Sequence, residues 1–521
     1  MEILFINAGD TFTHKASANA ALYPNVGLLT IMSALKEKLE ISGISAALGY
    51  IDGCVYGNEK IKSIISENRN TIKIVCFSVL TANYGASVEI AKFSKECIGG
   101  VTTIFGNDHF SALYRNVMSK QSDIDFGFYG NDVVMGFAEF ACDVICNNVG
   151  DLSSYPGLVY RLTNNDVVRN AENPSEYNGL PLVKYSLCDE TLPHSELYVD
   201  GQRRTYYFMK NRNLRSQIID IGRGCIKFSG KRVNNIPVNA CDFCGIIPGV
   251  KSVLSTSSDI AWKRIRNAFE HGYNYFYITA DELPLTFWPL IKSMSQNVPK
   301  WFEELSAEQK PKMFGYARAE AFERQPEKID ILVGVFGFDH FFVGFDGLSD
   351  ISLRLMNKQS VVKKEKEYGL MSANIDALNA ISSRGCLITA GIVVTHLGIT
   401  ENIMQENYQN LEILVSENHK TFAALDFGPL CPIPGSQSFR YLVDPNFAQE
   451  KAKKYGLRVN YEYLNFTKEK YENCDLFDNN ELIDDFMKGC CPDINQEILE
   501  RYMEKISDLA RRHGIVVGGG V

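Results

Sequence analysis

Two short stretches decide how this chain is interpreted: IDIGRGC at residues 219–225 and ACDFCG at residues 240–245. Together they carry three cysteines, Cys225, Cys241 and Cys244. Two cysteines separated by two residues can bind one metal centre, and a third cysteine at a glycine-flanked strand end completes a three-thiolate site. Four thiolates would close the coordination of zinc or of an iron–sulfur cluster, whereas three leave one position for chemistry. The two stretches therefore predict a metal centre with an open coordination position.

The bulk properties of the chain fit a soluble enzyme. Its 521 residues suggest about two to four domains. A net charge of -9 leaves no basic excess to neutralise phosphates, which argues against a general nucleic-acid binder. We find no apolar run of membrane-spanning length and no signal peptide at the start, so we expect a cytoplasmic protein. In that compartment the 14 cysteines are expected to be reduced thiols.

Residues 1–148 are predicted to form a doubly wound α/β domain with a parallel sheet, because strand and helix patterns alternate. Apolar runs that suit buried strands fall at 2–8, 45–52, 72–80, 101–106 and 125–130, and helical spacing falls at 26–39, 86–97 and 133–146. Small polar residues follow the strand ends, where such sheets bind ligands. Gly9 stands alone after the first strand, so the three-glycine fingerprint of a nicotinamide or flavin dinucleotide site is missing.

The rest of the chain is predicted to hold a connector, a barrel and a helical end. Residues 149–215 are predicted to form a connector with a small hairpin at 158–168. Residues 216–440 alternate again, with predicted strands that end at Gly222, Thr279, Ala317, Gly344, Val394 and Leu430. About six such units predict a full or partial (β/α) barrel whose active site lies at the carboxyl ends of the strands, where the cysteines fall. Residues 441–521 are charged and predicted to be a mainly helical C-terminal domain.

Several segments share their order and spacing with the motifs of one enzyme family. They are YPNVGLL at 23–29, the serine- and threonine-containing segment 78–84, GNDH at 106–109, YGND at 129–132, VGFDGLSD at 343–350 and PIPGS at 432–436. Together with the cysteine stretches, they make the chain resemble the B12-binding-domain radical SAM enzymes over most of its length. The resemblance implies an N-terminal cobalamin-binding Rossmann-like domain followed by a radical SAM partial (β/α) barrel.

The resemblance also implies two cofactors in the barrel. A [4Fe–4S] cluster would be held by Cys225, Cys241 and Cys244, and its fourth iron would bind S-adenosylmethionine (SAM). Four residues at the strand ends are expected to contact SAM: Asp281, Glu282, Arg318 and Asp346. Of these, Arg318 could pair with the SAM carboxylate through a bidentate fork, and Asp346 stands where the family has a glutamate near the ribose.

Cobalamin is the third cofactor that the resemblance implies. Its expected contacts are Ser78, Thr81, Gly106, Asn107, His109, Gly130 and Asn131. The chain departs from the family in two ways. It lacks the Asp-x-His-x-x-Gly motif that supplies a cobalt-binding histidine in some members. In addition, fifteen residues, 226–240, separate the first two cluster cysteines, where the family has three. The inserted loop is predicted to be a solvated basic surface, because it carries Lys227, Lys231 and Arg232.

The function that these observations predict is radical SAM chemistry, most directly cobalamin-dependent methyl transfer to an unactivated carbon or a phosphinate of a small-molecule or natural-product substrate. A cobalamin-dependent rearrangement or cyclisation without methyl transfer is an alternative within the class. A zinc-binding, non-catalytic scaffold is an alternative of another class, with Cys188 or His194 as the fourth ligand. The expected partners are the substrate and a low-potential electron donor such as flavodoxin or ferredoxin, and neither nucleic acid nor membrane.

Overall fold

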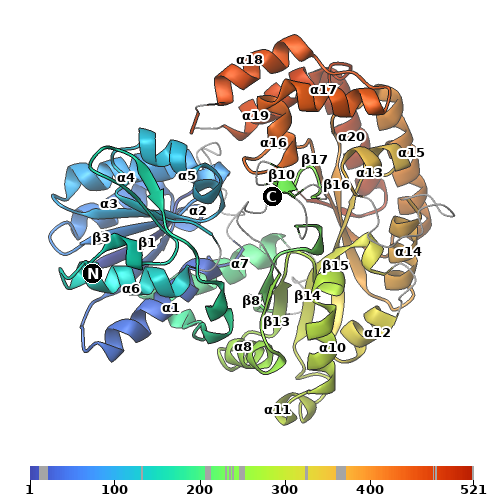
Figure 1. Ribbon diagram of the computed structural model, residues 1–521. Coiled ribbons are helices and arrows are strands. Elements are labelled where there is room, and N and C mark those ends of the chain that lie inside the picture. The colour runs from blue at the N-terminus through green and yellow to red at the C-terminus, as the bar shows by residue number, and fades with distance from the viewer. Residues whose placement is uncertain are drawn as a thin grey trace.

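The computed structural model describes most of the chain. The described residues are 1–10, 22–130, 133–205, 213–228, 232–233, 236–237, 240–245, 253–322, 327–358, 371–472, 474–475 and 478–518. Within these ranges no helix is both long enough and apolar enough to cross a membrane. Figure 1 shows an α/β domain at the N-terminal end beside a larger barrel-like domain, with helices of the C-terminal segment above the latter.

The N-terminal domain is built on a seven-stranded sheet in the order β2-β1-β3-β4-β5-β6-β7. Its parallel strands match the five predicted ones: β1 (Ile3–Asn7), β2 (Leu48–Asp52), β3 (Ile74–Ser78), β4 (Thr102–Gly106) and β5 (Phe126–Phe128). The predicted hairpin is also present, as β6 (Leu158–Arg161) and β7 (Val167–Arg169). It pairs antiparallel with β5, so the sheet extends beyond the first 148 residues.

Helices cover both faces of this sheet. They are α1 (Val26–Ile41), α2 (Gly53–Tyr56), α3 (Asn58–Glu67), α4 (Tyr84–Cys97), α5 (Asp108–Lys120) and α6 (Val134–Ile145). Along β1, Ile3 and Phe5 pack with one core and Leu4 and Ile6 with the other, as expected when successive side chains of a strand point to opposite faces. The doubly wound architecture is therefore confirmed, whereas α3 and α5 were not predicted.

The connector is compact and largely irregular. Its elements are the 3-10 turns η2 (Leu152–Ser154), η3 (Pro174–Gly179) and η4 (Tyr185–Asp189), followed by α7 (Ser195–Thr205). Tyr198 of α7 donates a 2.6 Å hydrogen bond to the buried carboxylate of Asp52 at the end of β2. Gln202 of the same helix donates to the Ser216 carbonyl at the start of the second sheet, so the connector joins the two sheets.

The second domain contains a seven-stranded parallel sheet in the order β18-β17-β16-β15-β14-β13-β8. The strands are β8 (Ser216–Asp220), β13 (Tyr275–Thr279), β14 (Lys312–Arg318), β15 (Phe338–Asp346), β16 (Leu387–Val393), β17 (Phe422–Gly428) and β18 (Val516–Gly518). The first six confirm the predicted strands. The seventh, β18, comes from the C-terminal segment, which was predicted to be mainly helical, and it pairs with β17.

Helices line the outside of the curved sheet and continue into the C-terminal segment. Those of the barrel are α8 (Ser258–Glu270), α9 (Leu283–Thr286), α10 (Trp288–Gln296), α11 (Lys300–Glu303), α12 (Glu327–Gly334), α13 (Asp350–Leu355), α14 (Met371–Ser382) and α15 (Glu401–Asn418), with η7 (Ala319–Ala321) after β14. Those of the C-terminal segment are α16 (Gln437–Val443), α17 (Pro445–Lys454), α18 (Tyr461–Tyr471), α19 (Asn479–Cys490) and α20 (Gln496–Arg512).

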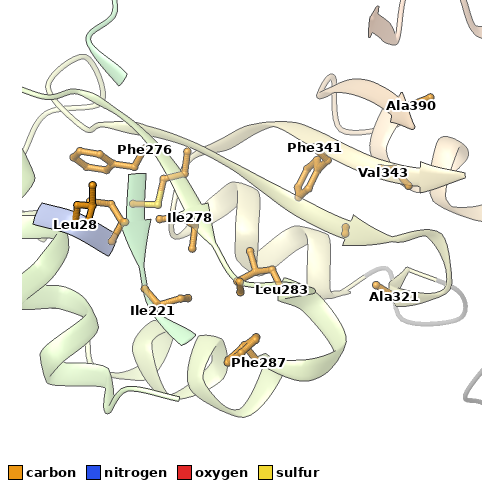
Figure 2. Close-up of a cluster of buried hydrophobic side chains, with 14 of the residues drawn as sticks. Leu28, Ile221, Phe276, Ile278, Leu283, Phe287, Ala321, Phe341, Val343 and Ala390 are labelled. Carbon is orange, nitrogen blue, oxygen red and sulfur yellow. The ribbon is translucent and has the colours of Figure 1, made fainter. Parts of the chain in front are cut away.

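A core of large apolar side chains supports the strand that leads to the first cluster cysteine. Figure 2 shows Ile221, Leu283 and Phe287 in this core. Phe287 fills the space beside Gly222, because a Cβ atom on that glycine would lie 2.1 Å from the ring. Gly222 belongs to the short strand β9 (Gly222–Arg223), which pairs with β12 (Leu254–Ser255). The missing side chain therefore lets the chain approach the core closely just before the cluster loop.

We expect Gly222→Ala to lower the free energy of unfolding by about 1–3 kcal/mol, because the added methyl group overpacks this core against Phe287. The measurement is urea unfolding followed by circular dichroism. Gly99→Ala is the matched control, since a Cβ atom there meets no heavy atom within 4 Å. Equal stability of the two variants would contradict the interpretation.

Candidate active site at the barrel mouth

The three predicted cluster cysteines lie together at the mouth of the barrel. Cys225 and Cys241 are buried, with 5% of each residue's surface exposed, and Cys244 packs against Cys225 and Ala240. Burial raises the pKa of the Cys225 thiol to about 11. Burial, followed by repulsion from the other two thiolates, also raises the pKa of Cys244. Three thiolates at this place need a cationic partner, and the donor set therefore fits an iron–sulfur cluster.

The loop between Cys241 and Cys244 is anchored by the residue after Cys241. The carboxylate of Asp242 is buried and forms an ion pair with Lys451 of α17, at 2.5 Å between Nζ and Oδ2. The Tyr441 hydroxyl of α16 donates to the same oxygen. The backbone of Asp242 also donates to the Met356 carbonyl. The C-terminal helices thus position the cysteine loop, a role that the sequence did not reveal.

Arg318 lies where it can act on both the cysteines and a bound ligand. One guanidinium nitrogen donates a 3.2 Å hydrogen bond to the Cys241 sulfur, and another pairs with Glu320. Arg318 is only 6% exposed, yet its Nε has no hydrogen-bond partner among the described residues. A buried donor without a partner is unusual, so this nitrogen is available to an anionic group such as the expected SAM carboxylate.

The other three expected SAM residues have different partners. Asp281 accepts a 2.5 Å hydrogen bond from the backbone N–H of Gly224 and so supports the cluster loop. Glu282 caps α9, because its carboxylate accepts from the backbone N–H groups of two residues in that helix. Asp346, at a positive φ of 52°, forms an ion pair with the buried Lys358. All three lie at strand ends, and their contact with SAM stays a prediction.

The inserted loop is partly described, as η6 (Ile226–Phe228), β10 (Arg232–Val233) and β11 (Ile236–Pro237). Lys227 is buried and donates to the Asn357 carbonyl at 2.9 Å, while the Asn357 side chain donates to the Ala240 carbonyl. The expectation of a solvated basic surface is wrong for this lysine. Its burial brings a positive charge close to the thiolates. Lys231 lies outside the described residues.

A second site, a cavity of about 200 Å³, lies beyond the carboxyl edge of the N-terminal sheet. It extends between the sheet and α1 and α6, with an apolar wall that includes Phe5, Leu28, Ile104, Phe128 and Phe137. Four of the predicted cobalamin contacts line it: Ser78, Gly106, Asn107 and Gly130. The apolar wall with few polar groups is typical of a site for a large organic cofactor.

Polar groups of this cavity are organised around Ser78. Its hydroxyl oxygen accepts hydrogen bonds from the side chains of Asn25 and Asn107, both at 2.9 Å. Asn25 also caps α1, and sequence reasoning included it only within the segment at 23–29. Asn107 has φ 81° and ψ -170°, a backbone conformation that is found almost only in glycine, so this position is strained.

Two predicted cobalamin contacts do not line the cavity. Thr81 and His109 bond to each other at 3.1 Å, and the other ring nitrogen of His109 lies 3.3 Å from the Asp475 carbonyl. The Asp475 carboxylate accepts from Tyr84 and Gln121 of the N-terminal domain. These residues join the C-terminal segment to the first domain.

The remaining predicted contact, Asn131, lies outside the described residues. None of the expected cobalamin contacts is tested directly by the structure, and they stay predictions.

The cavity and the barrel mouth meet at Asp220 and Arg223, which also line the cavity. Asp220 pairs with Arg223 at 3.2 Å and accepts a hydrogen bond from Tyr177 at 2.7 Å. Asp108, at the start of α5, lies near Arg223 and Asp281. Arg223 stands two residues before the first cluster cysteine, so the two candidate cofactor sites adjoin.

The described residues give the zinc alternative no support. Among the described residues, no three His, Cys, Asp or Glu side chains converge on a point where they could hold one metal ion. The expected fourth ligands are engaged elsewhere: the Cys188 sulfur lies 3.2 Å from the Ser195 hydroxyl, and His194 accepts from the backbone of Asp52.

Comparison with solved structures identifies the fold. The radical SAM methyltransferase TsrM from Kitasatospora setae, solved with cobalamin and a [4Fe–4S] cluster, has a TM-score of 0.60 and 14% identity over 87% of this chain and 78% of TsrM. The cobalamin-dependent SAM radical enzyme OxsB, with aqua-cobalamin bound, has a TM-score of 0.61 and 15% identity over 88% of this chain and 62% of OxsB. The sequence itself matches no protein-family profile and no curated protein.

The chain therefore has the fold of the cobalamin-dependent radical SAM enzymes. The predicted fold class is confirmed, and the resemblance that the sequence motifs indicated holds at the level of the fold.

We expect Lys451→Met to lower the free energy of unfolding by about 3–5 kcal/mol, because it leaves the Asp242 carboxylate buried without its cation. The cysteine loop should loosen with it, so iron retention after reconstitution should fall as well. The measurements are denaturant unfolding and iron analysis. Lys453→Met, an exposed lysine on the same helix, is the control and should change neither.

Proposed function

We propose that this protein is a cobalamin-dependent radical SAM enzyme that transfers a methyl group to an unactivated carbon or phosphinate of a small molecule. One observation carries the proposal: the cavity at the edge of the N-terminal sheet is lined by Asp220 and Arg223, next to the loop that holds Cys225. A corrin in the first site would therefore border a SAM molecule in the second. The methyltransferase TsrM, which shares this fold, supports the methyl-transfer assignment.

In this proposal Cys225, Cys241 and Cys244 hold a [4Fe–4S] cluster with one iron open to SAM. A cluster held there would supply the one-electron chemistry that cleaves SAM and allows reaction at an unactivated substrate position. Arg318 binds the SAM carboxylate through the side of its guanidinium that has no partner. Asp281 and Glu282 keep the loop and α9 in place beside it. A low-potential protein such as flavodoxin or ferredoxin would deliver the electron.

Cobalamin would lie against Ser78, Gly106, Asn107 and Gly130, with part of it in the apolar cavity. Bound there, it would supply the methyl group. Gly130 has a positive φ of 102°, which favours glycine, and the Glu172 carboxylate occupies the space that a side chain at this position would need. Asn25 and Asn107 hold Ser78 at the edge of the site.

Anaerobic reconstitution with iron, sulfide and hydroxocobalamin tests the cluster. We expect about four irons per chain, the content of one cluster, and a marked loss of iron in Cys241→Ala and Cys244→Ala. Cys146→Ala is the control, because this exposed cysteine lies at the end of α6, away from the loop. Full iron in the two loop variants, or one zinc per chain in the wild type, would overturn the proposal.

The cavity is tested by filling it. Val134 lines the cavity from α6, and Val134→Trp should reduce bound corrinoid by about tenfold or more, since the larger ring occupies the space that the cofactor needs. Iron content should stay unchanged. Met135→Trp, on the exposed side of the same helix, should bind corrinoid normally. Visible absorbance after gel filtration measures both, and equal corrinoid in the two variants would place the cofactor elsewhere.

A further inference from the structure

The inner face of the barrel sheet carries a distinct set of side chains. Along the barrel strands, buried residues such as Phe341, Ala390 and Leu425 pack in the core under the outer helices. The alternate residues point to the inside of the barrel and are mostly half-buried. They include Tyr277 on β13, Tyr316 on β14, Phe342 on β15, Thr389 and Gly391 on β16 and Asp426 on β17.

Strand register places four of the inward positions in one row. Arg318 pairs with Gly344, Gly344 with Gly391 and Gly391 with Asp426. The row therefore has a cation at one end, a carboxylate at the other and two glycines between them. Because Arg318 contacts the Cys241 sulfur, its end of the row borders the proposed cluster.

Aromatic rings form the surface next to this row. The Phe342 ring leans over Gly391, since a Cβ atom on that glycine would lie 2.8 Å from the ring. Tyr316 packs on Phe342 with 4.4 Å between ring centroids, and Tyr277 lies 5.5 Å from Tyr316. Such a wall favours flat apolar groups, and the faces of its rings also attract cations.

Asp426 has neither a hydrogen-bond partner nor an ion-pair partner among the described residues. Its carboxylate is half-buried. By contrast, Asp242, Glu320 and Asp346 each form an ion pair with a lysine or an arginine. A carboxylate that is partly shielded from water and has no partner is available to pair with a cation on a ligand.

We propose that the inner wall of the barrel binds the substrate, and that Asp426 pairs with a basic nitrogen on a substrate that also carries an aromatic or other flat apolar group. The rings of Tyr316 and Phe342 hold the flat group, while Asp426 anchors the nitrogen at the end of the row opposite Arg318. This arrangement extends the substrate across Gly344 and Gly391 toward the cluster side. The inference rests on the proposed function for the reaction that the substrate undergoes. The binding of the substrate depends only on the side chains of the inner wall.

Calorimetry on the anaerobically reconstituted protein tests the charge preference with three probes that share one ring. These are 2-phenylethylamine, 2-phenylethanol and 3-phenylpropanoate. We expect the amine to bind about tenfold or more tighter than the alcohol and the carboxylate to bind most weakly, as one partly buried charge pair implies. Absence of amine binding, or a preference for the alcohol or the anion, overturns the proposal.

Variants assign the preference to one side chain. Asp426→Asn keeps the shape and removes the charge, so the amine should lose its advantage over the alcohol. Asp426→Glu keeps the charge and should retain a preference for the amine. Asp330→Asn is the matched control, because Asp330 lies on the outer helix α12 and pairs with Arg384. An unchanged amine preference in Asp426→Asn would overturn the assignment, as would its loss in Asp330→Asn.

Stability provides a readout that needs no ligand. Asp426→Asn should melt no lower than the wild type, because burial raises the pKa of this carboxyl and its charge opposes folding at neutral pH. A lower melting temperature would mean that the carboxylate has a structural role and would count against the proposal. Iron and corrinoid are measured on the same samples. Normal iron and corrinoid contents without a preference for the amine would contradict this inference alone. Absence of iron would contradict the proposed function.

Discussion

The buried ion pair between Asp242 and Lys451 is the constraint on which the candidate active site depends. Asp242 lies between two of the cysteines, so a buried carboxylate is built into the loop that must present thiolates. It stays buried only because the C-terminal helices provide a cation and a hydroxyl, and because its backbone is bonded to Met356 and Ser438. The helical end of the chain therefore orders the cysteine loop as well as packing against the barrel.

The same C-terminal segment also joins the two domains. Asp475 accepts hydrogen bonds from Tyr84 and Gln121, and its carbonyl meets the ring of His109, which stacks on Tyr84 at 4.2 Å. These contacts hold the edge of the first sheet toward the mouth of the barrel. Because the cavity reaches Asp220 and Arg223, the two proposed cofactors would be neighbours without any large movement of the domains.

Unsatisfied polar groups distinguish binding positions from structural ones in this protein. Most buried charges near the barrel mouth are paired, as buried charges must be. Arg318 Nε and the Asp426 carboxylate lack partners among the described residues, and both lie on the same row of the inner wall. Because both groups lie on the wall that faces the proposed substrate site, bound ligands explain their lack of partners.

The sequence by itself determined the architecture and the cysteine set. Apolar runs report which strands are buried, and the alternation of strands with helices specifies a parallel sheet, so both sheets could be predicted. Other features could not be predicted: the helices α3 and α5, the strand β18, the burial of Lys227 and the contact of His109 with Asp475. Each depends on residues far apart in the chain. A local sequence pattern predicts whether a side chain is buried. Strand register and domain packing decide which residues that side chain contacts. For that reason the tertiary structure alone aligned Asp426 with Arg318 across the barrel.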